Sequence, residues 1–140
     1  MHAAGQKNQN GFTMSPRWLD YFFIFATIAL TVFGQVILKW RMDQLGPLPT
    51  GIGGGLRYLF SVLIDPVVLS SFGSAFLAGL AWMAALTRFE LSYAYPFMSL
   101  SFVLVLVISV TFLGETLTLN KVLGVALIGI GTVVASAGTQ

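Results

Sequence analysis

The sequence has no cysteine and only one histidine, His2, among its 140 residues. Without cysteine the chain forms no disulfide and no thiolate metal site. No serine–histidine–aspartate set, carboxylate pair or metal-ligand cluster can be assembled from the remaining residues. We therefore expect no catalytic residues, no bound metal and no cofactor, and we expect that the protein is not an enzyme.

Charged side chains are scarce, at 9% of the residues, whereas a soluble domain carries about 25%. The seven lysines and arginines are scattered, and no basic cluster suggests a nucleic acid as partner. Hydrophobic residues make up 56% of the chain, and the mean hydropathy is +0.87. This composition indicates a membrane protein whose surroundings are a lipid bilayer.

The long apolar runs predict an all-α protein with four transmembrane helices, because each run is close to the 20 residues that cross the hydrocarbon core. The predicted spans are about 18–40, 66–87, 92–113 and 121–138. The polar residues 1–16 predict a flexible tail before a single transmembrane domain at 17–140. The run 56–64 is too short to span and is apolar on one side, which predicts an amphipathic helix at the membrane interface.

A polar ladder interrupts the first apolar run. Thr27, Thr31, Gln35 and Lys39 recur every fourth residue and therefore share one face of a helix. In one interpretation the threonines bond to their own backbone, Gln35 bonds to a neighbouring helix, and Lys39 reaches the headgroups. In the other they line a cavity, because polar groups facing lipid are costly. We favour the cavity for Gln35 and Lys39.

The third run has a matching polar face. Tyr95 and Ser99 lie one turn apart, and Pro96 between them removes a backbone donor and predicts a kink in the helix. Tyr95 lies deeper than the usual interfacial aromatic residues. We therefore expect Tyr95 to line the same cavity as Gln35.

Small residues recur every seven positions in the last run. Gly124, Gly131 and Gly138 form this stripe, with Ala135 on the same face. A seven-residue spacing keeps one helical face nearly in line, and small residues allow a close helix–helix approach. The stripe is consistent with internal packing, but we favour contact with a second subunit, so that the protein works as a dimer.

Several motifs resemble one transporter superfamily. The AYP at 94–96, the GE at 114–115 and the glycine repeat of the last run resemble the C-terminal half of drug/metabolite transporters, in their EamA-like and small four-helix members. FGQVILK at 33–39 is similar to the end of the first helix in that family. The resemblance covers about 18–138. It implies that the protein lies in the bacterial inner membrane and forms a dimer, either with a second copy of itself or with a similar small subunit.

Two branches of that superfamily differ at the position that Thr31 occupies in this sequence. Small multidrug resistance transporters carry a glutamate at this position, and no Asp or Glu lies at mid-depth in the predicted spans here. The sequence is more similar to the small subunits that flip aminoarabinose-phosphoundecaprenol, which share the GQ and the later lysine. This resemblance implies a polyprenyl-phosphate-linked sugar as substrate.

With that substrate, threonine and glutamine side chains would hold the sugar, and basic side chains would meet the phosphate at the membrane edge. The predicted substrate-binding residues are Thr27, Thr31, Gln35, Lys39, Arg41, Tyr95 and Ser99. Two other functions stay open from the sequence. One is an exporter of small metabolites or organic cations, and the other is a non-transporting partner subunit of a larger membrane complex.

Overall fold

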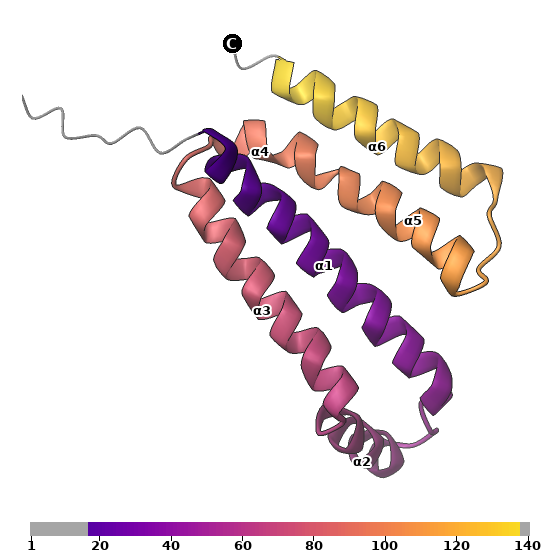
Figure 1. Cartoon of the computed structure of the whole chain (residues 1–140). Helices are drawn as coiled ribbons and strands as arrows, with labels where there is room; N and C mark the ends of the chain where they lie inside the picture. The colour runs from indigo at the N-terminus through magenta and orange to yellow at the C-terminus, as the bar shows by residue number, and fades with distance from the viewer. Residues whose placement is uncertain (1–16, 138–140) are drawn as a thin grey trace, which may run out of the picture.

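A computed structural model describes residues 17–137, and every regular element in that range is an α-helix. The predicted tail at 1–16 lies outside the described residues. Figure 1 shows α1 and α3 side by side, α2 across one end of this pair, and α6 along the outer side of α4 and α5. The helices are α1 (Arg17–Leu45), α2 (Ile52–Leu63), α3 (Pro66–Leu86), α4 (Leu91–Met98), α5 (Leu100–Phe112) and α6 (Leu119–Ala137).

The hydrophobic core lies along one face of α1. Ile24, Ile28 and Val32 are one turn apart and are all buried, as is Ala85 of α3. These residues share a face because side chains four positions apart align along a helix. The α1–α3 pair is the most extensive helix contact in the described chain.

Gly34 allows the backbones of α1 and α3 to approach closely. A Cβ atom at Gly34 would lie 3.1 Å from the backbone oxygen of Ser71. One turn away, the Ser74 hydroxyl donates a 2.6 Å hydrogen bond to the backbone oxygen of Leu30. Small residues and interhelical hydrogen bonds are the main means of holding helices together in lipid.

The third predicted span is not one continuous helix. The prediction of a helix over 92–113 is corrected to two helices, α4 and α5, that are separated at Ser99. The interruption comes three residues after Pro96, which has no N–H to donate to the turn before it. At the break the Ser99 hydroxyl donates a 2.5 Å hydrogen bond to the Pro96 carbonyl.

The helix between the first two spans is longer than predicted, since α2 begins at Ile52 rather than at residue 56. Gly51 has a φ of 104°, a conformation that glycine adopts readily, and α2 starts directly after it. Gly55 is buried inside α2, so packing outweighs the low helix propensity of the Gly53–Gly55 run. The apolar row of α2 is exposed, and it consists of Ile52, Leu56, Leu59, Phe60 and Leu63.

Three described segments are long and apolar enough to cross a membrane, and they are Trp18–Leu45, Pro66–Leu86 and Leu91–Phe112. The last of these contains both α4 and α5. α6 contributes a shorter apolar stretch, Leu119–Ala135. Large hydrophobic side chains cover the outside of all these helices, as expected for a protein in lipid. The start of α1 and the end of α6 lie at the same end of the bundle (Figure 1).

An ion pair joins α1 to the start of α3. The Arg41 guanidinium donates to one Asp65 oxygen at 2.6 and 3.0 Å, and the other Asp65 oxygen accepts from the Val67 and Val68 amides. Asp65 thus caps α3, with Pro66 at the first helical position. The bond from Arg41 lowers the pKa of the Asp65 carboxyl, and the amides lower it further, although burial opposes them.

Asp65→Asn is expected to lower the melting temperature at neutral pH, and its difference from the wild-type protein is expected to shrink as the pH falls below about 4. A depressed folded pKa contributes stability that is complete above the unfolded value, about 3.9 for aspartate, and is lost as the pH falls through the folded pKa. Asparagine can still cap the helix, so the variant isolates the charge. Thermal unfolding in detergent from pH 7 to pH 3 measures the difference, and a gap that stays constant across this range would contradict the prediction.

Candidate functional site: a cavity within the helix bundle

A cavity of about 530 Å³ lies between α1, α3, α4, α5 and α6. Most of its wall is apolar, and a few polar side chains converge on it, which is typical of small-molecule sites. Its lining residues are Thr27, Thr31, Gly34, Gln35, Leu38, Ser71, Phe72, Ala75, Ala78, Gly79, Trp82, Tyr95, Met98, Ser99, Ser101, Phe102 and Thr132.

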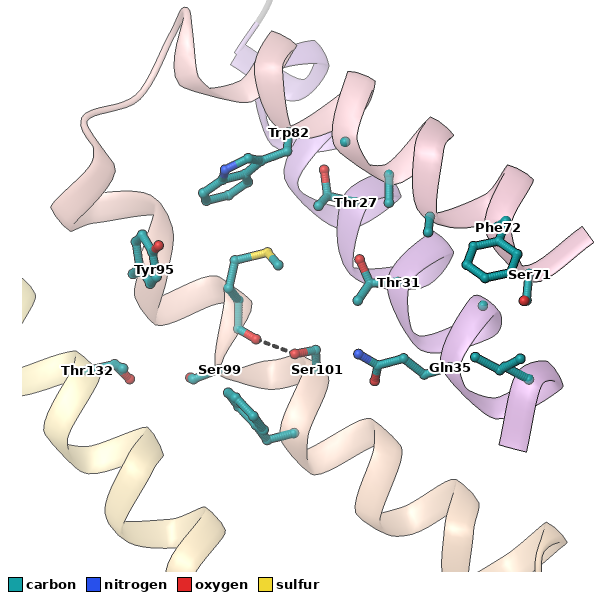
Figure 2. A pocket seen from close by; sticks show the side chains of 17 residues that line it. Thr27, Thr31, Gln35, Ser71, Phe72, Trp82, Tyr95, Ser99, Ser101 and Thr132 are labelled. Atoms are coloured by element: carbon teal, nitrogen blue, oxygen red, sulfur yellow. Dashed lines mark hydrogen bonds between the residues drawn. The ribbon is translucent and has the colours of Figure 1, made fainter. Parts of the chain in front are cut away.

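Three of the four ladder residues of α1, Thr27, Thr31 and Gln35, form one wall of this cavity (Figure 2). The Thr27 hydroxyl is buried and donates to the Phe23 carbonyl at 2.8 Å, so the backbone-bonding interpretation holds there. The side chains of Thr31 and Gln35 make no hydrogen bond to another described residue. The Gln35 amide extends towards Ser101 across the cavity (Figure 2). Two donor and acceptor groups therefore remain available to a ligand.

Hydroxyl groups from α4, α5 and α6 form the opposite wall. The Ser99 and Ser101 hydroxyls donate to carbonyls of α4 at 2.5 and 2.6 Å, and the Thr132 hydroxyl donates to a carbonyl of α6 at 3.0 Å. A hydroxyl that has donated its proton still has lone pairs that can accept a hydrogen bond. This wall therefore offers acceptors, whereas the Gln35 amide offers both donors and an acceptor.

Aromatic rings close the end of the cavity near α4. The Trp82 and Tyr95 rings are 6.0 Å apart and nearly perpendicular, an arrangement that aromatic pairs favour. Both side chains line the cavity. Tyr95 was predicted to line the same cavity as Gln35, and both side chains line this cavity.

Of the seven predicted binding residues, five line the cavity, and Lys39 and Arg41 do not. The Lys39 ammonium lies 2.6 Å from Asp43 with both side chains half exposed. Arg41 is bonded to Asp65, as described above. Sequence reasoning missed Trp82, Ser101 and Thr132. Ser101 lies only two residues after Ser99, but nothing in the local pattern distinguished Trp82 from an interfacial tryptophan.

Two further hollows share residues with the central cavity. One, of about 620 Å³, lies towards the start of α4 and shares Tyr95 and Thr132. The other, of about 450 Å³, lies towards the end of α5 and shares Gln35, Ser101 and Phe102. Because the shared side chains border both spaces, the three hollows form a row along α6.

The predicted dimer stripe of α6 divides between two environments. Gly124 borders the hollow near the end of α5, and Ala135 borders the hollow near the start of α4. Gly131 is exposed with open space at its Cβ position. Gly138 lies outside the described residues. A straight helix rotates about 20° per seven residues, so a repeat of seven drifts around its surface.

Comparison with known proteins gives a consistent family. The EamA-like transporter family matches residues 13–137. A protein of Aeromonas hydrophila named "Probable 4-amino-4-deoxy-L-arabinose-phosphoundecaprenol flippase subunit ArnF" is 32% identical over 86% of this chain and 84% of its own. A protein of the same name from Enterobacter sp. is 34% identical over 81% of this chain and 91% of its own.

A third protein of that name, from Sodalis glossinidius, is 35% identical over 79% of this chain and 85% of its own. No solved structure gives a significant match. These relatives are named as subunits of a flippase, that is, of a transport protein. Together with the long apolar helices, they identify a multi-pass protein of the bacterial inner membrane. The chain belongs to the EamA-like transporter family.

Proposed function

We propose that this protein flips a polyprenyl-phosphate-linked amino sugar across the bacterial inner membrane. The observation that carries the proposal is the cavity within the bundle, where the ladder residues Thr31 and Gln35 present free polar groups inside an apolar wall. The printed names of the relatives supply the substrate class. The residues of the site bind the lipid-linked sugar and help it to cross the membrane, and we propose no catalytic step.

The sugar and the charged phosphate are the parts of such a lipid that cannot cross hydrocarbon unaided. Unpaired hydroxyl groups cost several kcal/mol in an apolar medium, about 2–7 depending on the reference. Gln35 and Thr31 on one wall, with Ser99 and Tyr95 on the other, can replace the water that the sugar loses. The polyprenyl tail stays in the surrounding lipid, since it needs no protein to be soluble there.

The phosphate is assigned to Lys39, at the membrane edge of the ladder. Its present partner, Asp43, is one turn away on α1, and the side chains are 49% and 50% exposed. An exposed ion pair of this kind contributes little to stability, so a phosphate can replace the carboxylate at small cost. Arg41 is bonded to Asp65 and is assigned the structural role of holding α1 to α3.

The proposal includes four membrane spans and a dimer. α6 is the fourth span, because its mainly apolar stretch Leu119–Ala135 can cross if the bilayer thins slightly or neighbouring residues extend the span. α2 lies at the interface with its exposed apolar row in lipid. Leu123, Leu127, Ile130 and Val134 leave an apolar face of α6 uncovered, which supports contact with a second small subunit.

Reconstitution into liposomes tests this function. The full chain, alone and with any subunit that copurifies, is expected to expose a polyprenyl-phosphate amino sugar to an amine-reactive reagent outside the vesicles faster than empty liposomes do. Failure to move this lipid under both conditions would overturn the proposal. Transport of a small organic cation without transport of the lipid would instead identify an exporter.

A further inference from the structure

The hollow near the end of α5 is the most strongly charged of the three. Its apolar walls come from α5 and α6, and its outer end is formed by Glu115, Asn120 and Lys121. Its inner end is Gln35, the residue that it shares with the central cavity. A chamber with an acidic and a basic side chain at one end fits a ligand that carries charges of both signs.

The turn after α5 holds Glu115 in this position. Gly114 has a φ of 67°, in the left-handed region that favours glycine, and so reverses the chain after the helix. The Glu115 amide then donates to the Ser109 carbonyl at 3.1 Å. These two features fix the backbone of Glu115 beside the hollow, whereas its side chain remains more than one third exposed.

The charges at this end are only loosely paired. The Lys121 ammonium lies 3.6 Å from a Glu115 oxygen and also donates to the Thr116 carbonyl at 3.1 Å. An exposed ion pair at this distance contributes little to stability, so a ligand with the same charges can take the place of either partner.

We propose that this hollow is the docking site for the headgroup, and that Glu115 selects lipids whose sugar carries an amine. In this arrangement the Glu115 carboxylate accepts from the sugar ammonium, and Lys121 and Lys39 lie beside the phosphate. The sugar then passes Gln35 to reach the central cavity. The inference rests on the proposed function, and it adds a selective residue that the central cavity does not contain.

The test uses two polyprenyl-phosphate pentoses that are identical except for an amine or a hydroxyl on the sugar. Binding to the full chain in micelles is measured by native mass spectrometry, and flipping is measured in liposomes. Glu115→Gln is expected to weaken binding of the amine lipid about ten-fold and to change binding of the hydroxyl lipid less than about two-fold. Glu90→Gln, an exposed glutamate at the other end of the bundle, is the matched control.

The outcomes separate the two proposals. An equal loss for both lipids in Glu115→Gln, or no loss for either, would overturn the docking site even if the wild-type protein flips them. Amine-selective binding that depends on Glu115, without flipping, would support the docking site and overturn the proposed function. Absence of binding to both lipids in the wild-type protein would overturn both.

Discussion

Replacing Gln35 by leucine is expected to lower flipping of the lipid-linked amino sugar about ten-fold while the protein stays folded. The side chain has no partner among the described residues, so its loss breaks no internal hydrogen bond. A bound sugar would lose one or two hydrogen bonds, each of which contributes about 1 kcal/mol. The liposome assay measures the rate, and the melting temperature in detergent measures folding.

A pair of threonines provides the control for this experiment. The Thr31 hydroxyl faces the cavity with no hydrogen-bond partner in the described part of the chain, whereas Thr111 is exposed on α5 and donates to the Val107 carbonyl. Threonine to valine removes one hydroxyl at nearly constant shape. Thr31→Val is expected to slow flipping and Thr111→Val to leave it unchanged. Equal flipping rates for Gln35→Leu, Thr31→Val and the wild-type protein would show that the cavity takes no part in transport.

Gly34→Leu is expected to prevent α1 and α3 from packing, with a loss of transport and of stability together. Even a Cβ atom at this position would lie 3.1 Å from the Ser71 backbone oxygen, and a backbone atom cannot move aside as a side-chain end can. Overpacking typically costs about 1–3 kcal/mol, and a leucine carries three further carbons. The interhelical bond from Ser74 to Leu30 would be lost as the helices separate.

Gly73→Leu is the matched control, since a Cβ built at Gly73 meets no described atom within 4 Å apart from its own helix backbone and its chain neighbours. It makes the same change of residue type on α3, where the new side chain would extend into open space. Yield and melting temperature in detergent are expected to fall for Gly34→Leu and to stay close to wild type for Gly73→Leu. Equal losses in the two variants would show that the close approach at Gly34 is not what holds the pair together.

Periodicity along a helix was enough to predict which ladder residues share a face. Thr27, Thr31 and Gln35 line the cavity because a spacing of four residues is a property of any α-helix. The same spacing places Lys39 on this face, but Lys39 does not line the cavity. Where the cavity ends can be seen only in the three-dimensional structure. The presence of Asp43 one turn further on was visible in the sequence as an i,i+4 pair.

Contacts between segments that lie far apart in the sequence could not be predicted from local sequence patterns. Arg41 meets Asp65 across 24 residues, and no spacing rule connects an arginine in one helix to the cap of another. The start of α2 was misplaced because Gly53–Gly55 have low helix propensity, which burial of Gly55 outweighs. Pro96 indicated a kink, but the position of the break at Ser99 depends on which backbone amides donate hydrogen bonds to the carbonyls around it.

The unequal burial of the helices has a consequence for how the protein is made. α1 and α3 supply the buried core residues Ile24, Ile28, Val32 and Ala85, with α4 and α5 packed against them, whereas no side chain described on α6 is buried. Synthesis delivers the N-terminal helices first, at about 5–20 residues per second. α1 and α3 can therefore pack against each other in the membrane seconds before α6 leaves the ribosome. α6 joins last, onto a bundle whose core is already complete.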